Sequence, residues 1–349
     1  MSLARAPFTA HPFLTNCHLQ TLWSRIARYR PRTQLCWHSF ELADGDFVDL
    51  AWSAPMAQVL ADHDTPLVVV FHGLEGSVYS PYADHLMSYA QQRNWHAVTM
   101  HFRGCSGRPN RTHRAYHSGD TADACRLIEW LHQHTRKPLF AAGFSLGGNM
   151  LVKLLGERPT LPLQAAVSVS APLALGPSSE RIDQGFSRVY RNHLVGALKR
   201  KVLAKQVAGQ LHGRLDLTAS QIEKIVNFRT FDDLVTAPLH GFDGVDDYYT
   251  RCSGLQFLPQ VQRPLLILHA QDDPFTCVSC IPEPALLPPS VTHELSQRGG
   301  HVGFVTSHNG KPRFWLSQRI FDFFQQHSCQ KHSAQKQRGN HANTLSTTR

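Results

Sequence analysis

The sequence has 349 residues, of which 42% are hydrophobic and 17% charged, so it can bury a large core, which excludes a disordered protein. Its net charge of +9 lies at the two ends. Residues 1–32 carry five arginines, residues 329–349 carry four basic residues, and neither segment has an acid. Because the remainder has equal numbers of bases and acids, no nucleic-acid-binding face is expected on the folded body.

The predicted elements begin with an antiparallel pair. Residues 37–42 and 47–52 are alternating segments joined across Asp44-Gly45, a dipeptide typical of hairpin turns. Short apolar runs, of the length expected for strands buried on both faces, then alternate with longer helical stretches. The predicted strands are 67–71, 96–102, 139–143, 165–170, 264–270 and 291–296, and the predicted helices are 80–93, 119–134, 146–157 and 312–326. This alternation indicates an α/β fold with a mostly parallel sheet flanked by helices.

The alternation is interrupted between residues 172 and 260. Nearly ninety residues there separate two predicted strands, far more than a single crossover needs. The pattern is largely helical, and a gating lid and a second packed subdomain fit it equally well. We therefore predict a core of residues 37–171 and 261–328 with a lid insertion at 172–260. Residues 329–349 are polar and without periodicity, which predicts a disordered basic tail.

The basic N-terminal segment, residues 1–36, contains an amphipathic stretch. Leu19, Leu22, Trp23 and Ile26 form one apolar stripe at helical spacing, with arginines opposite. We favour packing of this segment on the protein's own body, and peripheral contact with a membrane is the alternative. No apolar run reaches the ~20 residues of a membrane-spanning helix.

The sequence has eight cysteines, and its first residues lack the pattern of a secretory signal peptide. Free thiols and a cytoplasmic location are therefore expected. Cys277 and Cys280 have the spacing of a metal or redox pair. No second Cys pair or His pair accompanies them, so neither a metal nor a cofactor is expected.

The segment Gly143–Gly147 has the sequence Gly-Phe-Ser-Leu-Gly and lies between a predicted strand and a predicted helix. This setting is typical of a nucleophile elbow, in which the serine hydroxyl stands clear of the sheet while nearby glycines avoid steric clashes. Ser145 is the predicted nucleophile. The following helix directs its N-terminal amides at the reacting centre, so the Leu146 N–H is a predicted oxyanion donor.

A serine hydroxyl needs a neighbouring base, and the base needs an acid that fixes its tautomer. In chains with such an elbow the order is Ser, acid, His. The strand at 264–270 is followed by two carboxylates, and we prefer Asp273 as the acid over its neighbour Asp272. His301 lies on a glycine-rich loop after the strand at 291–296 and is the predicted base.

A second oxyanion donor is expected on the loop that follows the strand at 67–71. This loop has the sequence His-Gly-Leu-Glu-Gly, and the Leu74 N–H is the predicted donor. His72 is expected to brace the loop rather than to transfer protons. Arg103, which follows the next strand, is expected to have a structural role.

Seven motifs in chain order resemble the YheT-type branch of the α/β-hydrolase superfamily, which is related to the ABHD group of esterases and lipases. The motifs are Asn16–Thr21, Asp44–Leu50, His72–Gly76, His101–Gly107, Gly143–Asn149, His269–Pro274 and Gly299–Phe304. The resemblance extends from about residue 11 to residue 326. It implies an α/β-hydrolase fold and a Ser-Asp-His triad that acts on carboxylic esters, acylglycerols among them. Ser145, Asp273 and His301 fall on its motif positions.

We therefore predict a serine hydrolase that cleaves small-molecule carboxylic esters through an acyl-enzyme. An acyltransferase with the same triad, using an alcohol or thiol as acceptor, is the alternative. A non-catalytic lipid-binding protein on the same scaffold is a third hypothesis, which the complete triad argues against. The acyl-chain length and the oligomeric state stay open.

Overall fold

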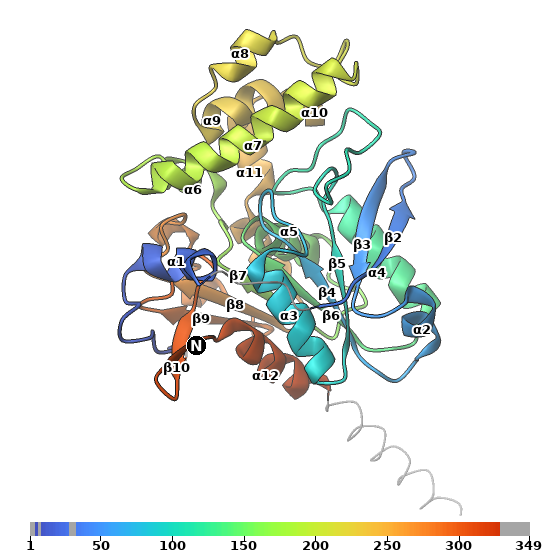
Figure 1. Ribbon diagram of the computed structural model, residues 1–349, viewed down its shortest axis with the longest axis vertical. Coiled ribbons are helices and arrows are strands. Elements are labelled where there is room, and N and C mark those ends of the chain that lie inside the picture. Colours follow the sequence, from blue (N-terminus) through green and yellow to red (C-terminus); the bar gives the residue numbers. More distant parts are fainter. Residues whose placement is uncertain (1–3, 6–7, 28–32, 329–349) are drawn as a thin grey trace, which may run out of the picture.

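A mostly parallel sheet forms the centre of the molecule in the computed structural model, which describes residues 4–5, 8–27 and 33–328 (Figure 1). The strand order is β1-β9-β8-β7-β6-β4-β5-β3-β2. Only the β2–β3 and β3–β5 pairings are antiparallel among these strands. The strands are β1 (Ala4–Arg5), β2 (Cys36–Glu41), β3 (Phe47–Trp52), β4 (Leu67–Phe71), β5 (His96–Met100), β6 (Leu139–Phe144), β7 (Ala165–Val169), β8 (Leu265–Ala270) and β9 (Val291–Ser296). The predicted hairpin and parallel strands are confirmed within a few residues.

Helices cover both faces of the sheet. Strands such as β4 and β6 are therefore buried along their whole length. The core helices are α2 (Met56–Ala61), α3 (Pro81–Gln92), α4 (Ala122–His134), α5 (Leu146–Glu157) and α12 (Leu316–Ser328). Apolar residues of α4 and α5 pack with one face of the sheet. Those of α3 and α12 pack with the other face.

The prediction of a closing helix from residue 312 was wrong at its start. Lys311–Phe314 forms β11, which pairs antiparallel with β10 (Val305–His308), and α12 begins only at Leu316. The two residues between these strands are Asn309 and Gly310, and both have a positive φ, at 51° and 74°. Asn-Gly is a strong hairpin signal, and it overrides the helical spacing of the phenylalanines that follow. The helix predicted from residue 119 likewise begins later, at Ala122.

The insertion between β7 and β8 forms the upper lobe in Figure 1. Its elements are α6 (Leu175–Arg181), α7 (Ser187–Val207), α8 (Ala219–Glu223), α9 (Phe228–Phe231), the π-helix η1 (Asp232–Thr236), α10 (Ala237–His240), α11 (Val245–Cys252) and the 3₁₀-helix η2 (Gly254–Gln260). The lobe has a small hydrophobic core of its own, formed by Val195, Val202, Leu211, Ile222, Ile225, Phe231, Val235 and Leu239. It is therefore a packed unit, and its movement as a lid stays a prediction.

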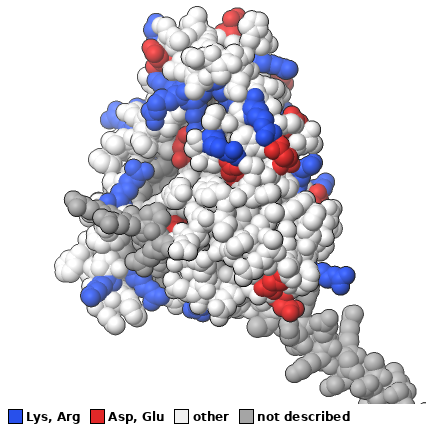
Figure 2. Space-filling model, turned by 45° about the vertical axis from the view of Figure 1, so that its right-hand side comes forward, with Lys and Arg blue, Asp and Glu red and all other residues white. Residues whose placement is uncertain are grey.

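Polar contacts join the lower side of this lobe to the sheet core. Figure 2 shows Lys and Arg residues gathered near the junction, with Asp and Glu residues close to them. Two lysines of α7 make such contacts: Lys201 pairs with Glu75 at 2.8 Å, and Lys205 Nζ donates to the Thr112 carbonyl at 2.6 Å. Helix α7 is thus fastened to the core along its second half.

The buried residue of the N-terminal helix α1 (Cys17–Ile26) is the polar Gln20. The Gln20 amide donates to the carbonyls of Leu14 and Val305 and accepts a hydrogen bond from the Val305 N–H. Leu19 and Ile26 of the stripe are 41% and 53% exposed. Membrane contact through this segment stays a prediction. The predicted tail, residues 329–349, lies outside the described residues.

No helix in the described part of the chain combines the length and the apolar character that crossing a membrane requires.

Two short 3₁₀-helices, η3 (Val278–Cys280) and η4 (Pro284–Leu286), complete the described elements between β8 and β9. The Cys280 thiol contacts the Ser178 hydroxyl at 3.0 Å, and burial raises its pKa to about 11. This thiol is therefore protonated at neutral pH.

Candidate active site

Ser145 occupies a sharp turn between β6 and α5. Its backbone is in a positive-φ conformation (φ 52°, ψ −119°) that is costly for a residue with a side chain, and its N–H donates to the Val169 carbonyl at 2.8 Å. Neighbouring glycines make this turn possible. A Cβ at Gly143 would lie 2.4 Å from the Gly147 carbonyl oxygen, and one at Gly147 would lie 2.5 Å from that of His72. Such strain at an accessible serine is the geometry of a nucleophile elbow.

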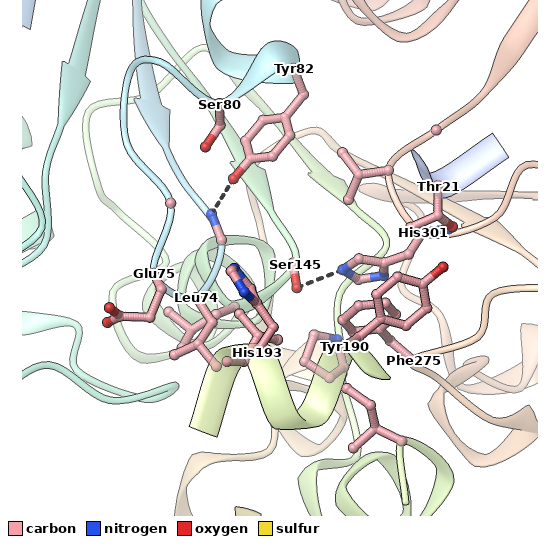
Figure 3. A pocket seen from close by; sticks show the side chains of 18 of the residues that line it. Thr21, Leu74, Glu75, Ser80, Tyr82, Ser145, Tyr190, His193, Phe275 and His301 are labelled. Carbon is pink, nitrogen blue, oxygen red and sulfur yellow. Dashed lines mark hydrogen bonds between the residues drawn. The ribbon is translucent and has the colours of Figure 1, made fainter. Parts of the chain in front are cut away.

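His301 connects the serine to a carboxylate. Its Nε2 lies 3.0 Å from Ser145 Oγ (Figure 3), and its Nδ1 lies 2.9 Å and 3.1 Å from the two oxygens of Asp273. The Asp273 side chain is 1% exposed, and its Oδ1 also accepts the Phe275 N–H at 2.8 Å. With the imidazole proton on Nδ1, Nε2 is free to accept the serine proton. The three predicted residues are therefore brought together in the required order.

Asp272, the rival candidate for the acid, binds a different group. Its Oδ1 accepts the Gly300 N–H at 2.9 Å. Burial raises the pKa of its carboxyl, and the charge on Asp273 beside it raises that pKa further. The structure therefore places Asp272 against the backbone of the histidine loop and Asp273 against the imidazole.

Two backbone N–H groups beside the serine are available to bind an oxyanion. On the loop after β4, the Gly73 N–H donates to the Tyr82 hydroxyl at 2.9 Å and the Glu75 N–H to the Tyr116 hydroxyl at 2.8 Å. Between them the Leu74 N–H, like the Leu146 N–H at the start of α5, has no acceptor among the described residues. Both residues line the cavity that contains Ser145. Unpaired donors at this position can stabilise a tetrahedral intermediate.

Comparison with known proteins places this geometry in a family. A family model described as the alpha/beta hydrolase fold matches residues 66–307. The chain belongs to the α/β hydrolase fold family. YheT of Escherichia coli (strain K12) is 48% identical over 311 residues, which cover 88% of this chain and 90% of that protein. Its name describes it as an esterase, with the activity not yet established.

More distant relatives of this α/β hydrolase carry lipase names. Phospholipase ABHD3 of Mus musculus is 29% identical over 292 residues, which cover 82% of this chain and 70% of that protein. Monoacylglycerol lipase of Saccharomyces cerevisiae is 26% identical over 280 residues, which cover 75% and 60% of the two chains. Among solved structures, the Pyrococcus furiosus esterase Pf2001 superposes with a TM-score of 0.52 at 13% identity, over 84% of this chain and 93% of that one, which shows the shared fold.

The histidine loop of this α/β hydrolase is held by contacts that sequence reasoning missed. The His301 N–H donates to Thr21 Oγ1 on α1 at 2.9 Å, and the Val302 N–H donates to Ser170 Oγ at 3.1 Å. The Phe275 ring stacks on the imidazole, with centroids 3.9 Å apart and planes 11° apart. Thr21 is the last residue of the motif Asn16–Thr21. The inclusion of this motif in the family resemblance was the one signal that could have pointed to a role for Thr21 at the site.

His72 and Arg103 act as braces, as their positions in the sequence suggested. His72 contacts the Gly73 carbonyl through Nδ1 at 2.7 Å and accepts the Phe102 N–H at Nε2. Burial lowers the pKa of His72 to about 3, so the ring is neutral and Nδ1 is its donor. Arg103 is 3% exposed and pairs with Asp44, Asp46 and Asp123. Neither side chain lines the cavity around Ser145.

The cavity around Ser145 has a volume of about 510 Å³ and lies between the sheet core, α1 and the insertion. Its apolar lining includes Leu22, Leu74, Leu146, Phe186, Val189 and Phe275. A cavity of this size and character is suited to an organic ligand with a sizeable apolar part. Within the described residues, no group of three or more His, Cys, Asp and Glu side chains is arranged to hold a metal ion.

Proposed function

We propose that this protein is a serine hydrolase that cleaves carboxylic esters through an acyl-enzyme at Ser145. The observation that carries the proposal is the position of His301, hydrogen-bonded to both Ser145 and Asp273, beside the unpaired N–H groups of Leu74 and Leu146. The names of the relatives, which include an esterase, a phospholipase and a monoacylglycerol lipase, support the same class.

The reaction follows from this geometry. His301 Nε2 takes the hydroxyl proton as Ser145 Oγ bonds to the ester carbonyl carbon. The carbonyl oxygen becomes an oxyanion that accepts hydrogen bonds from the Leu74 and Leu146 N–H groups, while Asp273 stabilises the imidazolium. The imidazolium then protonates the departing alkoxide, which leaves as the alcohol. Water, deprotonated by the same imidazole, attacks the acyl-enzyme. The imidazolium returns this proton to Ser145 Oγ as its bond to the acyl carbon breaks and the carboxylic acid is released.

The cavity supports lipid-like esters as the substrate class. Many of the side chains that line the cavity around Ser145 are apolar, among them the oxyanion-loop leucine and the first leucine of α5. Burying each methylene of an acyl chain contributes about 0.8 kcal/mol, so longer chains should bind more tightly until the cavity is filled.

A series of p-nitrophenyl esters from acetate to palmitate tests the proposal. We expect kcat/KM to rise with chain length to an optimum, and a burst of p-nitrophenol equal to the enzyme concentration wherever deacylation is slow. Ser145→Ala should abolish both. Turnover that survives this substitution, or a wild-type protein without activity on any of these esters, would contradict the proposed function.

A further inference from the structure

The loop that contains Leu74 is held by more contacts than its own backbone provides. Glu75, the next residue, has a φ of 54°, in the left-handed region that strains a side-chain-bearing residue. The Tyr116 hydroxyl accepts the Glu75 N–H at 2.8 Å and donates to Glu75 Oε1 at 2.7 Å. Both contacts fix the Glu75 conformation. Because Leu74 and Glu75 share a peptide unit, the two Tyr116 contacts also restrict the orientation of the loop around the Leu74 N–H.

A lysine from the insertion completes this network. Lys201 of α7 donates from Nζ to Glu75 Oε1 at 2.8 Å, and its ammonium lies 3.1 Å from Cys105 Sγ. The Glu75 side chain is 10% exposed and that of Lys201 is 35% exposed, so solvent screens the pair only in part. Burial opposes the charge on Lys201, but Cys105 and Glu75 raise its pKa overall, so the side chain stays an ammonium.

The Glu75 carboxylate does not itself face the reacting atoms. In Figure 3 it points away from Ser145, while Tyr190 and His193 of α7 lie on the serine's side of the cavity. Glu75 is therefore not a proton donor or acceptor in the reaction. Its two partners instead come from separate parts of the chain: Tyr116 from the core and Lys201 from the insertion.

The opposite end of α7 contacts the other half of the catalytic site. Ser187 Oγ donates to the Pro274 carbonyl at 2.8 Å, next to Asp273. The Tyr190 ring packs on that of Phe275, with centroids 4.9 Å apart, and Phe275 stacks on His301. One 21-residue helix thus contacts both the oxyanion loop and the acid loop.

We propose that Lys201 is a positioning residue for the oxyanion hole. When α7 packs on the core, the ion pair of Lys201 with Glu75 aligns the Leu74 N–H. The inference rests on the proposed function and gives the insertion a direct role in it. Oxyanion donors act because they are held in place before the reaction begins, and a misplaced donor loses much of its effect. Seating of α7 and completion of the oxyanion hole are thereby coupled.

Replacement of Lys201 by methionine tests the proposal, because it keeps the length of the side chain and removes the charge. We expect kcat for a p-nitrophenyl ester to fall about ten-fold with KM within about two-fold, since the lost interaction acts on the transition state. Lys201→Arg, which keeps the cation, should restore most of kcat. Glu75→Gln should give a similar loss, and the double variant should lose little more than either single one.

Lys205→Met is the matched control. Lys205 lies one turn further along α7 and also fastens the helix to the core, but its Nζ binds the Thr112 carbonyl and not the oxyanion loop. Its kcat should stay within about two-fold of the wild type. A second measurement is the affinity for an alkyl boronic acid, which forms a tetrahedral adduct with the serine. This affinity should fall in Lys201→Met by about the same factor as kcat, and should not fall in Lys205→Met.

The outcomes separate the inference from the proposed function. If the wild type hydrolyses esters and Lys201→Met keeps kcat within about two-fold, or if Lys201→Met and Lys205→Met lose equal activity, the positioning role is wrong. If the wild type itself neither hydrolyses esters nor binds the boronic acid, the proposed function has failed instead. Should Lys201→Met fold poorly, Lys201→Gln, which also removes the charge, takes its place in the cycle with Glu75→Gln, and additive losses in that double variant would exclude coupling.

Discussion

The carboxylates of Asp272 and Asp273, neighbours in the chain, bind two consecutive residues of one loop. Asp272 accepts the Gly300 N–H at 2.9 Å, and Asp273 contacts the His301 imidazole at 2.9 Å. In the proposed mechanism the first contact positions the loop, and the second sets the tautomer of the base. The two carboxylates therefore differ in what their loss would do to the reaction.

Asp273→Asn should lower kcat by about 10³- to 10⁴-fold, because an amide can hold the imidazole in the wrong tautomer and cannot stabilise its charge. Asp272→Asn keeps an acceptor for the Gly300 N–H and should cost no more than about ten-fold. Steady-state kinetics on one ester measure both variants. A larger loss in Asp272→Asn would reverse the assignment of the acid.

Thr21→Val should impair the reaction although Thr21 does not contact the serine. The hydroxyl of Thr21 accepts the His301 N–H, and valine leaves this partly buried donor without its partner at a cost of about 1–2 kcal/mol. We expect kcat to fall roughly three- to thirty-fold if most of this cost displaces the loop. Thr21→Ser keeps the acceptor and is the control. Equal activity in Thr21→Val and Thr21→Ser would show that α1 does not position the base.

Gly147→Ala should destabilise the fold at the elbow. A Cβ there would lie 2.5 Å from the His72 carbonyl oxygen and 2.6 Å from that of Phe71, and both are backbone atoms that cannot rotate away. The expected loss in free energy of unfolding is about 2–3 kcal/mol, measured by urea titration.

The control for this substitution is Gly196→Ala in the middle of α7, where the nearest atom to the new Cβ is a flexible arginine nitrogen at 3.5 Å. It should stabilise the protein by up to about 1 kcal/mol, because alanine favours helix more than glycine does. If both alanine variants were equally stable, the close packing of the elbow would not constrain residue 147.

Asp232 gives the stability of the protein a pH dependence. Burial raises the pKa of its carboxyl from 3.8 to about 6, although the hydroxyls of Thr236 and Tyr249 donate to it. Between these two values the unfolded chain releases its proton first, so this group lowers the free energy of unfolding as pH rises from about 4 to about 6. Above that window the cost is constant, on the order of 3 kcal/mol.

Asp232→Asn should therefore gain stability relative to the wild type as the pH rises through this window. Urea titrations below and above it measure the difference, and Asp233→Asn, at the exposed neighbouring residue, is the control. If the free energies of unfolding of the wild type and of Asp232→Asn differed by the same amount at both pH values, the Asp232 carboxyl would not be desolvated in the folded protein.

The sheet and the elbow were predictable because each depends on local sequence. The β4 and β6 segments are continuous apolar runs, and the glycines at 143 and 147 are needed where the turn passes against neighbouring backbone. The order of serine, acid and histidine then pointed to His301 and to the pair Asp272 and Asp273, of which Asp273 was preferred.

Other features depend on contacts between distant parts of the chain, which periodicity does not encode. Thr21 binds a residue 280 positions later, and Lys201 binds one 126 positions earlier. The buried polar Gln20 fastens α1, while Leu19 and Ile26 of the apolar stripe are exposed. The β10–β11 hairpin had a local signal in Asn309-Gly310, and the helical spacing of the phenylalanines after it hid that signal.

Covalent labelling of Ser145 by a fluorophosphonate tests the central claim most directly. Incubation of the wild-type protein with the probe, followed by intact-mass and peptide mass spectrometry, should show one adduct per chain on the peptide that contains Ser145. Ser145→Ala should give no adduct, and Asp273→Asn should react far more slowly than the wild type. A wild-type protein that is not labelled, or an adduct that persists in Ser145→Ala, would contradict the account.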